Sequence, residues 1–82
     1  MLKVHILNIE DIYVPTGRQK ELDPEKLEIT AEQILEETVE KPISVRKGND
    51  RYVLLKGIHR LEARKALGET TIKSHILNAK QR

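Results

Sequence analysis

The sequence predicts one compact α+β domain whose elements follow the order β-α-β-β-α-β and whose strands form a small mixed sheet. Its 82 residues are enough for one core, since two cores would each approach the size at which small domains become marginal. Apolar residues make up 38% of the chain and charged residues 34%, which is typical of a globular protein. Segments with strand periodicity and helical periodicity follow one another. We therefore expect residues 1–82 to form a single domain.

The N-terminal segment has the alternation of a strand. Apolar side chains recur near every second position, at Leu2, Val4, Ile6 and Ile9. This spacing predicts a strand over residues 2–9 with one buried face. Residues 11–14 would extend it briefly before Pro15-Thr16-Gly17 interrupts the chain. Arg18 is then expected in a loop.

A helix is expected from residue 24 to about residue 38. Asp23 can accept backbone amide hydrogen bonds as the N-cap, and Pro24 fits the first helical position. Apolar side chains then recur at helical spacing, at Leu27, Ala31, Ile34, Leu35 and Val39. The glutamates occupy the other faces, and Pro42 lies beyond the expected end.

The second half of the chain predicts a hairpin, a helix and a last strand. Residues 42–46 and 51–55 flank a Lys-Gly-Asn-Asp turn, which is typical of two antiparallel strands. A helix is expected over 58–67, because apolar residues recur there and a glycine follows. Residues 71–77 resemble a strand, and 78–82 are expected to form a frayed tail.

The composition excludes several classes of protein. The chain has no cysteine, which rules out a disulfide scaffold, thiolate zinc sites and thiol catalysis. No apolar run approaches the roughly 18 residues of a membrane span, and no signal peptide is recognisable. We therefore expect a soluble protein of the cytoplasm with no membrane partner.

Charge is distributed unevenly between the two halves of the chain. Residues 1–41 carry five basic and ten acidic side chains, whereas residues 42–82 carry ten basic and three acidic ones. This asymmetry indicates a phosphate-bearing partner for the second half. An acidic helix that faces the basic half of the same molecule would explain it equally well.

The strongest candidate site lies where the second hairpin strand runs into the following helix. Its residues are Lys56, Gly57, Ile58, His59 and Arg60. Free amides of a first helical turn and the helix dipole favour an anion, and a glycine allows a ligand close to the backbone. Lys56, His59 and Arg60 add donors, and Arg64 would extend the patch by one turn. Taken alone, the motif also fits a plain turn beside a solvated basic face.

The wider context of this motif resembles the N-terminal domain of ParB-type partition proteins and the related sulfiredoxin family. The resemblance covers nearly the whole chain. It rests on Ile9, Pro15, Arg18, the 27–34 helix, Pro42-Ile43-Ser44-Val45, the run from Tyr52 to Ala63, and Ala66-Leu67-Gly68. It implies a ParB/sulfiredoxin-like fold.

The resemblance also implies a ligand and the residues that bind it. In this superfamily the Gly-x-His-Arg box binds nucleotide phosphates, of CTP in many ParB proteins and of ATP in sulfiredoxins and related kinases. Gly57, Ile58, His59 and Arg60 would then lie against the phosphates of CTP or ATP with Mg²⁺, helped by Lys56 and Arg18. Sulfiredoxin activity is not expected, because Ile58 stands where that enzyme needs cysteine. No DNA-reading helix-turn-helix segment is recognisable in the 82 residues, so we expect a stand-alone nucleotide-binding module associated with partition or regulation.

Two other functions remain open from the residues. One is an ATP-dependent phosphotransferase acting on a small molecule, for which His59 is the candidate acid or base. The other is sequence-independent binding or cleavage of a DNA backbone by the basic half. Arg46, Lys47 and Arg51 around the hairpin turn would take part, although basic residues also protect exposed strand edges.

No metal site is predicted. Glu32, Glu36 and Glu40 follow one another at one-turn spacing, but a solvated acidic face explains them better than a metal, and Glu37 is no better placed. His5 and His75 are expected to be ordinary strand residues. An uncovered strand edge would also allow a homodimer.

Overall fold

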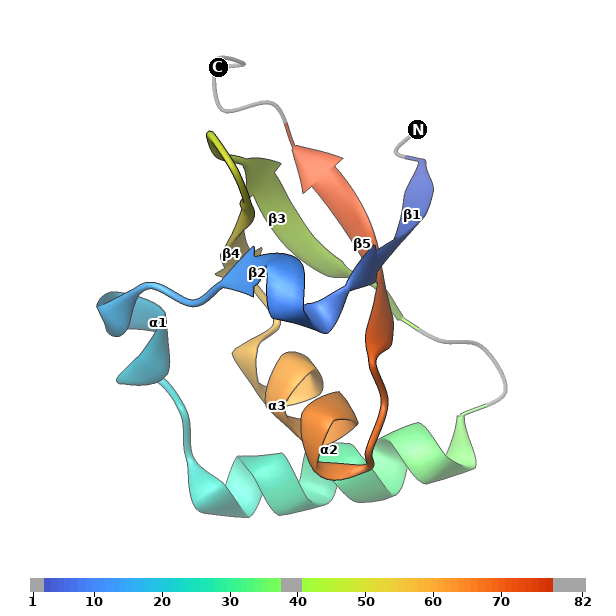
Figure 1. Cartoon of the computed structure of the whole chain (residues 1–82). Helices are drawn as coiled ribbons and strands as arrows, with labels where there is room; N and C mark the ends of the chain where they lie inside the picture. The colour runs from blue at the N-terminus through green and yellow to red at the C-terminus, as the bar shows by residue number, and fades with distance from the viewer. Residues whose placement is uncertain (1–2, 38–40, 78–82) are drawn as a thin grey trace.

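The computed structural model describes residues 3–37 and 41–77 of the chain. Five strands, three α-helices and one 3₁₀ turn follow one another in these segments (Figure 1). In chain order they are β1 (Val4–Asn8), η1 (Ile9–Asp11), β2 (Ile12–Tyr13), α1 (Thr16–Gln19), α2 (Pro24–Glu36), β3 (Ile43–Lys47), β4 (Tyr52–Lys56), α3 (Ile58–Ala66) and β5 (Thr71–Leu77). The predicted α+β class and the order of the main elements are confirmed.

The strands form one mixed sheet in the order β1-β5-β3-β4-β2. The outermost strand β1 is antiparallel to β5, β5 is parallel to β3, β3 is antiparallel to β4, and β4 is parallel to β2. β4 therefore lies between its hairpin partner and the short β2, and its C-terminal end leads directly into α3. This position brings the candidate motif to the edge where the helices meet the sheet (Figure 1).

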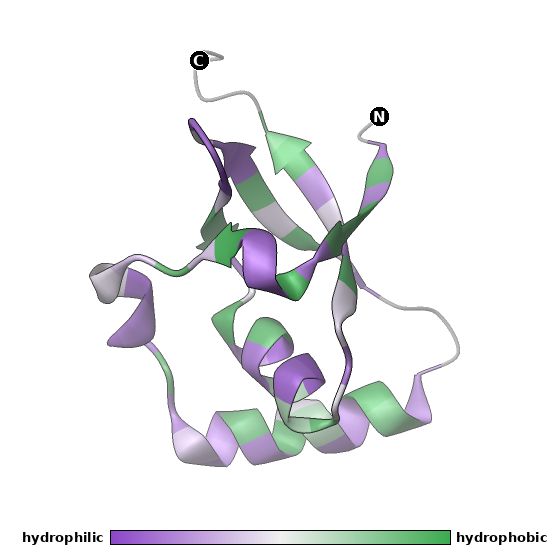
Figure 2. Cartoon of the chain, in the orientation of Figure 1, coloured by the Kyte–Doolittle hydropathy of each residue, from purple (hydrophilic) through white to green (hydrophobic). Residues whose placement is uncertain are grey.

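The core lies inside the curl of this sheet, and α3 closes it. Eight branched aliphatic side chains form one buried cluster, which consists of Ile9, Ile12, Ile43, Val45, Leu54, Ile58, Leu61 and Ile72. The helix α2 packs against the far side of α3 and contributes Ile34 as its one buried residue. The bands of apolar and polar residues along α2 in Figure 2 reflect this half-exposed position. α3, which begins with the candidate motif, is thus packed between the core and α2.

The burial predicted along the first strand is wrong at Val4 and Ile6, whereas that of Ile9 is confirmed, and Leu2 lies outside the described residues. Val4 is 50% exposed and Ile6 68% exposed, whereas the intervening Leu7 packs against the core. β1 is an edge strand, and in Figure 1 α2 and α3 lie on the inner side of the sheet. Alternation shows that a strand has two unlike faces, but it does not say which face a helix covers.

Three other local expectations differ from the structure. The extension over 11–14 is a separate strand at the opposite edge, because η1 turns the chain between β1 and β2. Arg18 lies in the short helix α1 rather than in a loop. The helix expected to reach residue 38 ends at Glu36, with Glu37 in an extended conformation. Val39 and the expected tail over 78–82 lie outside the described residues.

Among the described residues, no helix combines the length and the apolar character that a membrane crossing requires.

Candidate functional site

The turn between β4 and α3 is built around Gly57. Its φ of 105° lies in the left-handed region, and a Cβ at this position would stand 2.6 Å from Cγ2 of the buried Ile43. Gly57 is therefore required by packing alone, whatever the turn binds. Its carbonyl accepts the first helical bond, from the amide of Leu61 at 2.9 Å. The amides of residues 58–60 precede that bond, so α3 itself offers them no acceptor.

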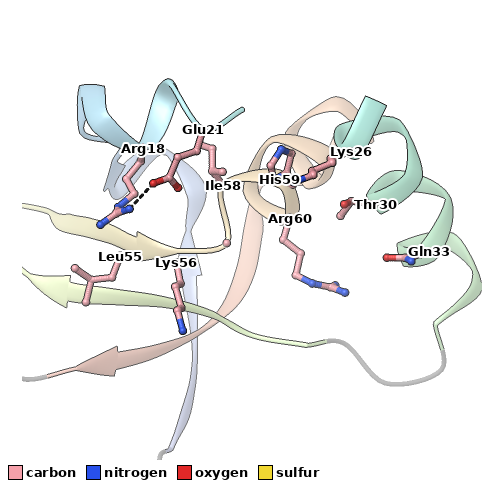
Figure 3. Close-up of a pocket in the computed structure, with 11 residues that line it drawn as sticks. Arg18, Glu21, Lys26, Thr30, Gln33, Leu55, Lys56, Ile58, His59 and Arg60 are labelled. Atoms are coloured by element: carbon pink, nitrogen blue, oxygen red, sulfur yellow. Dashed lines mark hydrogen bonds and ion pairs between the residues drawn. The ribbon is translucent and has the colours of Figure 1, made fainter. Parts of the chain in front are cut away.

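A pocket of about 600 Å³ opens at this turn. α1, α2, β4 and α3 all contribute to its wall (Figure 3). The lining residues are Arg18, Glu21, Lys26, Thr30, Gln33, Leu55, Lys56, Gly57, Ile58, His59 and Arg60. The structure thus places all six site residues predicted from the sequence in one pocket, although Arg18 is far from the others along the chain.

Cations from four elements surround the pocket. Arg18 comes from α1, Lys26 from α2, Lys56 from the end of β4 and Arg60 from α3. The Arg18 guanidinium contacts the Glu21 carboxylate at 2.6 Å in an exposed ion pair. Among the described residues, neither lysine ammonium has a carboxylate partner. The pocket therefore favours an anion, because its cations outnumber its one lining carboxylate.

The imidazole of His59 connects the first turn of α3 to the start of α2. Its Nε2 accepts a hydrogen bond from the backbone amide of Asp23 at 2.9 Å, and the Asp23 carboxylate accepts one from the amide of Glu25. Since Nε2 accepts, the neutral ring carries its proton on Nδ1. One ring nitrogen thus has a structural role, and Nδ1–H is the group that can donate to a ligand.

Arg60 is held by a carboxylate from the end of α2. Both terminal nitrogens of the guanidinium donate to Glu37, Nη1 to Oε2 at 3.1 Å and Nη2 to Oε1. The two side chains are only 14% and 16% exposed. Hydrogen bonds from Arg60 and its positive charge lower the pKa of Glu37, against a smaller opposing effect of burial. The pair connects the C-terminal end of α2 to the N-terminal end of α3.

Sequence reasoning missed the contribution of α2 to the pocket. Lys26, Thr30 and Gln33 line it, and Glu37 continues the same spacing of four, three and four residues. Such a spacing forms one stripe along a helix. This polar stripe lies beside the apolar one and was the available signal. Arg64, expected to extend the patch, is instead buried and bound to Glu69 at 2.8 Å.

The remaining candidate ligands lie elsewhere. Within residues 3–37 and 41–77, no three His, Asp or Glu side chains gather as a metal site would require. Glu32 and Glu36 are exposed on α2, and Glu40 lies outside the described residues. His5 and His75 lie in β1 and β5, as expected, and the His75 ring approaches the carbonyl of Lys3 at 3.1 Å.

Comparisons with known proteins show the family and the fold of this chain. The ParB N-terminal domain family matches residues 1–82, the whole chain. No curated protein matches the chain. Among solved structures, sulfiredoxin from Arabidopsis thaliana is similar, with 28% identity, a TM-score of 0.80, and coverage of 94% of this chain and 86% of that one.

Two larger proteins share the same fold over part of their length. C-terminally truncated ParB from Caulobacter crescentus, complexed with CTP-γ-S, gives 24% identity and a TM-score of 0.78, covering 96% of this chain and 46% of that one. A free serine kinase in complex with AMP gives 22% identity and a TM-score of 0.76, covering 93% and 31%. The chain spans less than half the length of each of these two.

Proposed function

Because the chain belongs to the ParB N-terminal domain family, we propose that its pocket binds the phosphate chain of a nucleoside triphosphate. The protein would act as a nucleotide-binding module in the cytoplasm, where such nucleotides are abundant. CTP and ATP are the two candidates, carried with Mg²⁺ whose remaining ligands the phosphates supply. The proposed binding residues are Arg18, Lys56, Gly57, Ile58, His59 and Arg60, together with Lys26.

One observation carries this proposal, namely the convergence of four cations on a helix start. Arg18, Lys26, Lys56 and Arg60 come from four different elements and line the same pocket. The helical amides of residues 58–60 add donors and the positive end of the α3 dipole. Phosphate oxygens are the acceptors that such a combination of charged and backbone donors suits best.

The structural neighbours support a nucleotide as the ligand. The similar ParB structure holds CTP-γ-S, and the similar serine kinase holds AMP. These two nucleotides differ in base and in number of phosphates, so the shared fold suits nucleotides in general. For this chain we therefore expect the phosphate contacts to dominate affinity and the choice of base to depend on residues around them.

Calorimetric titration with ATP, CTP and GTP, each with and without Mg²⁺, tests the proposal. At least one nucleotide should bind. Arg60→Ala should lower its affinity about tenfold or more, because a charge-assisted hydrogen bond contributes roughly 1.5–3 kcal/mol. Arg51→Ala on the β3–β4 hairpin is the matched control and should leave affinity unchanged. Absence of binding at millimolar concentrations, or equal affinities for wild type and Arg60→Ala, would reject a nucleotide site.

Association with DNA is a second candidate, favoured by the tip of the β3–β4 hairpin. Arg46, Lys47 and Arg51 border a cleft there, at a distance from the pocket along β4. Contacts of these cations to a phosphate backbone would release counterions, so affinity for duplex DNA should fall steeply with added salt. Lys47→Gln should reduce that salt dependence. Salt-independent binding, or none, argues against this function.

A phosphotransferase reaction is favoured by the position of Glu21. This carboxylate lines the pocket beside Arg18, where it can accept a proton from the hydroxyl group of a bound acceptor. Magnesium-dependent consumption of ATP that Glu21→Gln abolishes without weakening ATP binding would support catalysis. Nucleotide that remains intact with every small alcohol tested would leave binding alone as the function.

A further inference from the structure

Glu37 is an acidic side chain in contact with a cation of the proposed phosphate site. We propose that Glu37 is a positioning residue, which holds the Arg60 guanidinium in the orientation that receives nucleotide phosphates. The inference rests on the proposed function, since it requires a phosphate in the pocket. Its opposite is also a definite model, in which the Glu37 carboxylate competes with the phosphate for Arg60. The two models predict opposite changes in nucleotide affinity when Glu37 loses its charge.

The geometry leaves Arg60 donors for a ligand. A guanidinium has five N–H groups, and one from each terminal nitrogen donates to Glu37. The Nε–H and the second hydrogen of each terminal nitrogen remain. One edge of the planar Arg60 guanidinium can therefore bind a phosphate while its two terminal nitrogens stay bound to the Glu37 carboxylate. Binding of the ligand does not require this ion pair to break.

The surroundings favour positioning over competition. Arg60 and Glu37 are 14% and 16% exposed, so the pair lies in a slot between α2 and α3 rather than in open solvent. A free arginine has many rotamers, and fixing them before the ligand arrives reduces the entropy lost on binding. The negative charge of Glu37 is offset for the ligand by Lys26 and Lys56, which line the same pocket.

The position of Glu37 in the chain supports the same reading. It follows the last residue of α2 and its amide donates to the carbonyl of Ile34 at 3.3 Å. It also continues the stripe of Lys26, Thr30 and Gln33, whose other members line the pocket. The carboxylate therefore lies at the end of the pocket-lining face of α2, where it contacts Arg60.

The test compares Glu37→Gln with Glu36→Gln by calorimetric titration of the full chain. Glutamine keeps the size of Glu37 but loses its charge and one acceptor, whereas Glu36 is exposed and serves as the matched control. For whichever triphosphate the wild type binds, we expect Glu37→Gln to lower the affinity about fivefold to tenfold. The corresponding nucleoside without phosphates should bind each variant alike. In an Arg60→Ala background, Glu37→Gln should have no further effect.

Each outcome decides the question. Tighter binding by Glu37→Gln would show competition and overturn positioning, and equal affinity would overturn it too, while both leave the nucleotide site intact. Equal losses with and without Arg60 would indicate a merely structural role. If the wild type binds no nucleotide, the proposed function fails and this inference with it. Should Glu37→Gln not fold by circular dichroism, Glu37→Asp takes its place, because its carboxylate is one methylene shorter and holds Arg60 less well. Weaker binding of the triphosphate by Glu37→Asp would support positioning, and unchanged or tighter binding would overturn it.

Discussion

Two basic clefts lined by described residues are similar in size but differ in how their cations are held. The pocket at the start of α3 measures about 600 Å³ and the cleft at the β3–β4 hairpin tip about 550 Å³. Cations of the first come from four elements, and Arg18 and Arg60 are bound by carboxylates. Those of the second, Arg46, Lys47 and Arg51, come from one hairpin, where Arg51 lies 3.9 Å from the ring centre of Tyr13.

The difference shows that cleft size and charge alone do not separate these two clefts. What distinguishes the pocket is that contacts within the fold fix three of its residues before any ligand arrives. His59 accepts from the amide of Asp23, Arg60 is held by Glu37, and Gly57 keeps a conformation that other residues rarely adopt. Fixed donors lose less entropy on binding than solvated ones. The hairpin tip offers charge without this order.

The largest expected effect comes from breaking the turn that builds the pocket. Gly57→Ala places a Cβ 2.6 Å from Cγ2 of Ile43 at a φ of 105°. We expect it to lower the free energy of unfolding by about 3 kcal/mol, from backbone strain together with overpacking. Gly17→Ala is the control, because nothing lies within 4 Å of its Cβ position. Urea unfolding measures both, and equal destabilisation of the two variants would contradict this account.

The next effect compares one lysine from each cleft. Lys26→Gln removes a cation of the pocket, and we expect nucleotide affinity to fall about tenfold, which corresponds to roughly 1.4 kcal/mol. Lys47→Gln removes a cation of the hairpin tip and should change nucleotide affinity less than about twofold, since exposed charges far from a ligand are screened. Titration of both variants with the same nucleotide tests the contrast. Similar losses would mean that net charge, not the pocket, attracts the nucleotide.

The fold was more predictable from the sequence than the face each strand buries. Turn residues and helical spacing give α2 its start at Pro24 and give the hairpin its position, because these signals are local. The exposure of Val4 and Ile6 could not be predicted in this way. It depends on β1 lying at a sheet edge with its outer face uncovered, which is a property of the tertiary arrangement.

The candidate site was predictable in part for the same reason. Lys56 to Arg60 are consecutive, so their proximity follows from the chain, whereas the approach of Arg18 was expected only from the family resemblance. Lys26 and Glu37 were missed because their contacts depend on how α2 packs against α3. The stripe of polar residues on α2 marks that face, yet a solvated helix shows the same pattern. Structure was needed to distinguish the two.

The pH dependence of stability provides a third comparison of the clefts, because the Glu37 carboxylate contacts Arg60 of the pocket. Its pKa lies below the usual 4.5 because Arg60 stabilises the charged form. The unfolded chain therefore binds the proton more readily, and this contribution to stability, present above about pH 4.5, is lost as the pH falls through the folded pKa. Glu37→Gln should flatten the loss of unfolding free energy below that pH. Arg51→Ala at the hairpin tip removes no partner of Glu37 and should leave the slope as in the wild type, and thermal unfolding between pH 3 and 7 would reveal either result.

The smallest expected effect concerns the only arginine–ring contact in the described residues. The Arg51 guanidinium lies over the ring of Tyr13, and Tyr13 is 40% exposed. Tyr13→Leu should lower the free energy of unfolding by about 0.5 kcal/mol, because a cation–π contact at an exposed site contributes little. Tyr13→Phe keeps the ring and should remain at the wild-type value. Nucleotide affinity should not change in either variant, because the Tyr13 ring contacts Arg51 at the hairpin tip and neither residue lines the pocket. A loss of affinity in Tyr13→Leu would instead connect the hairpin tip to the nucleotide site and remove the distinction between the two clefts.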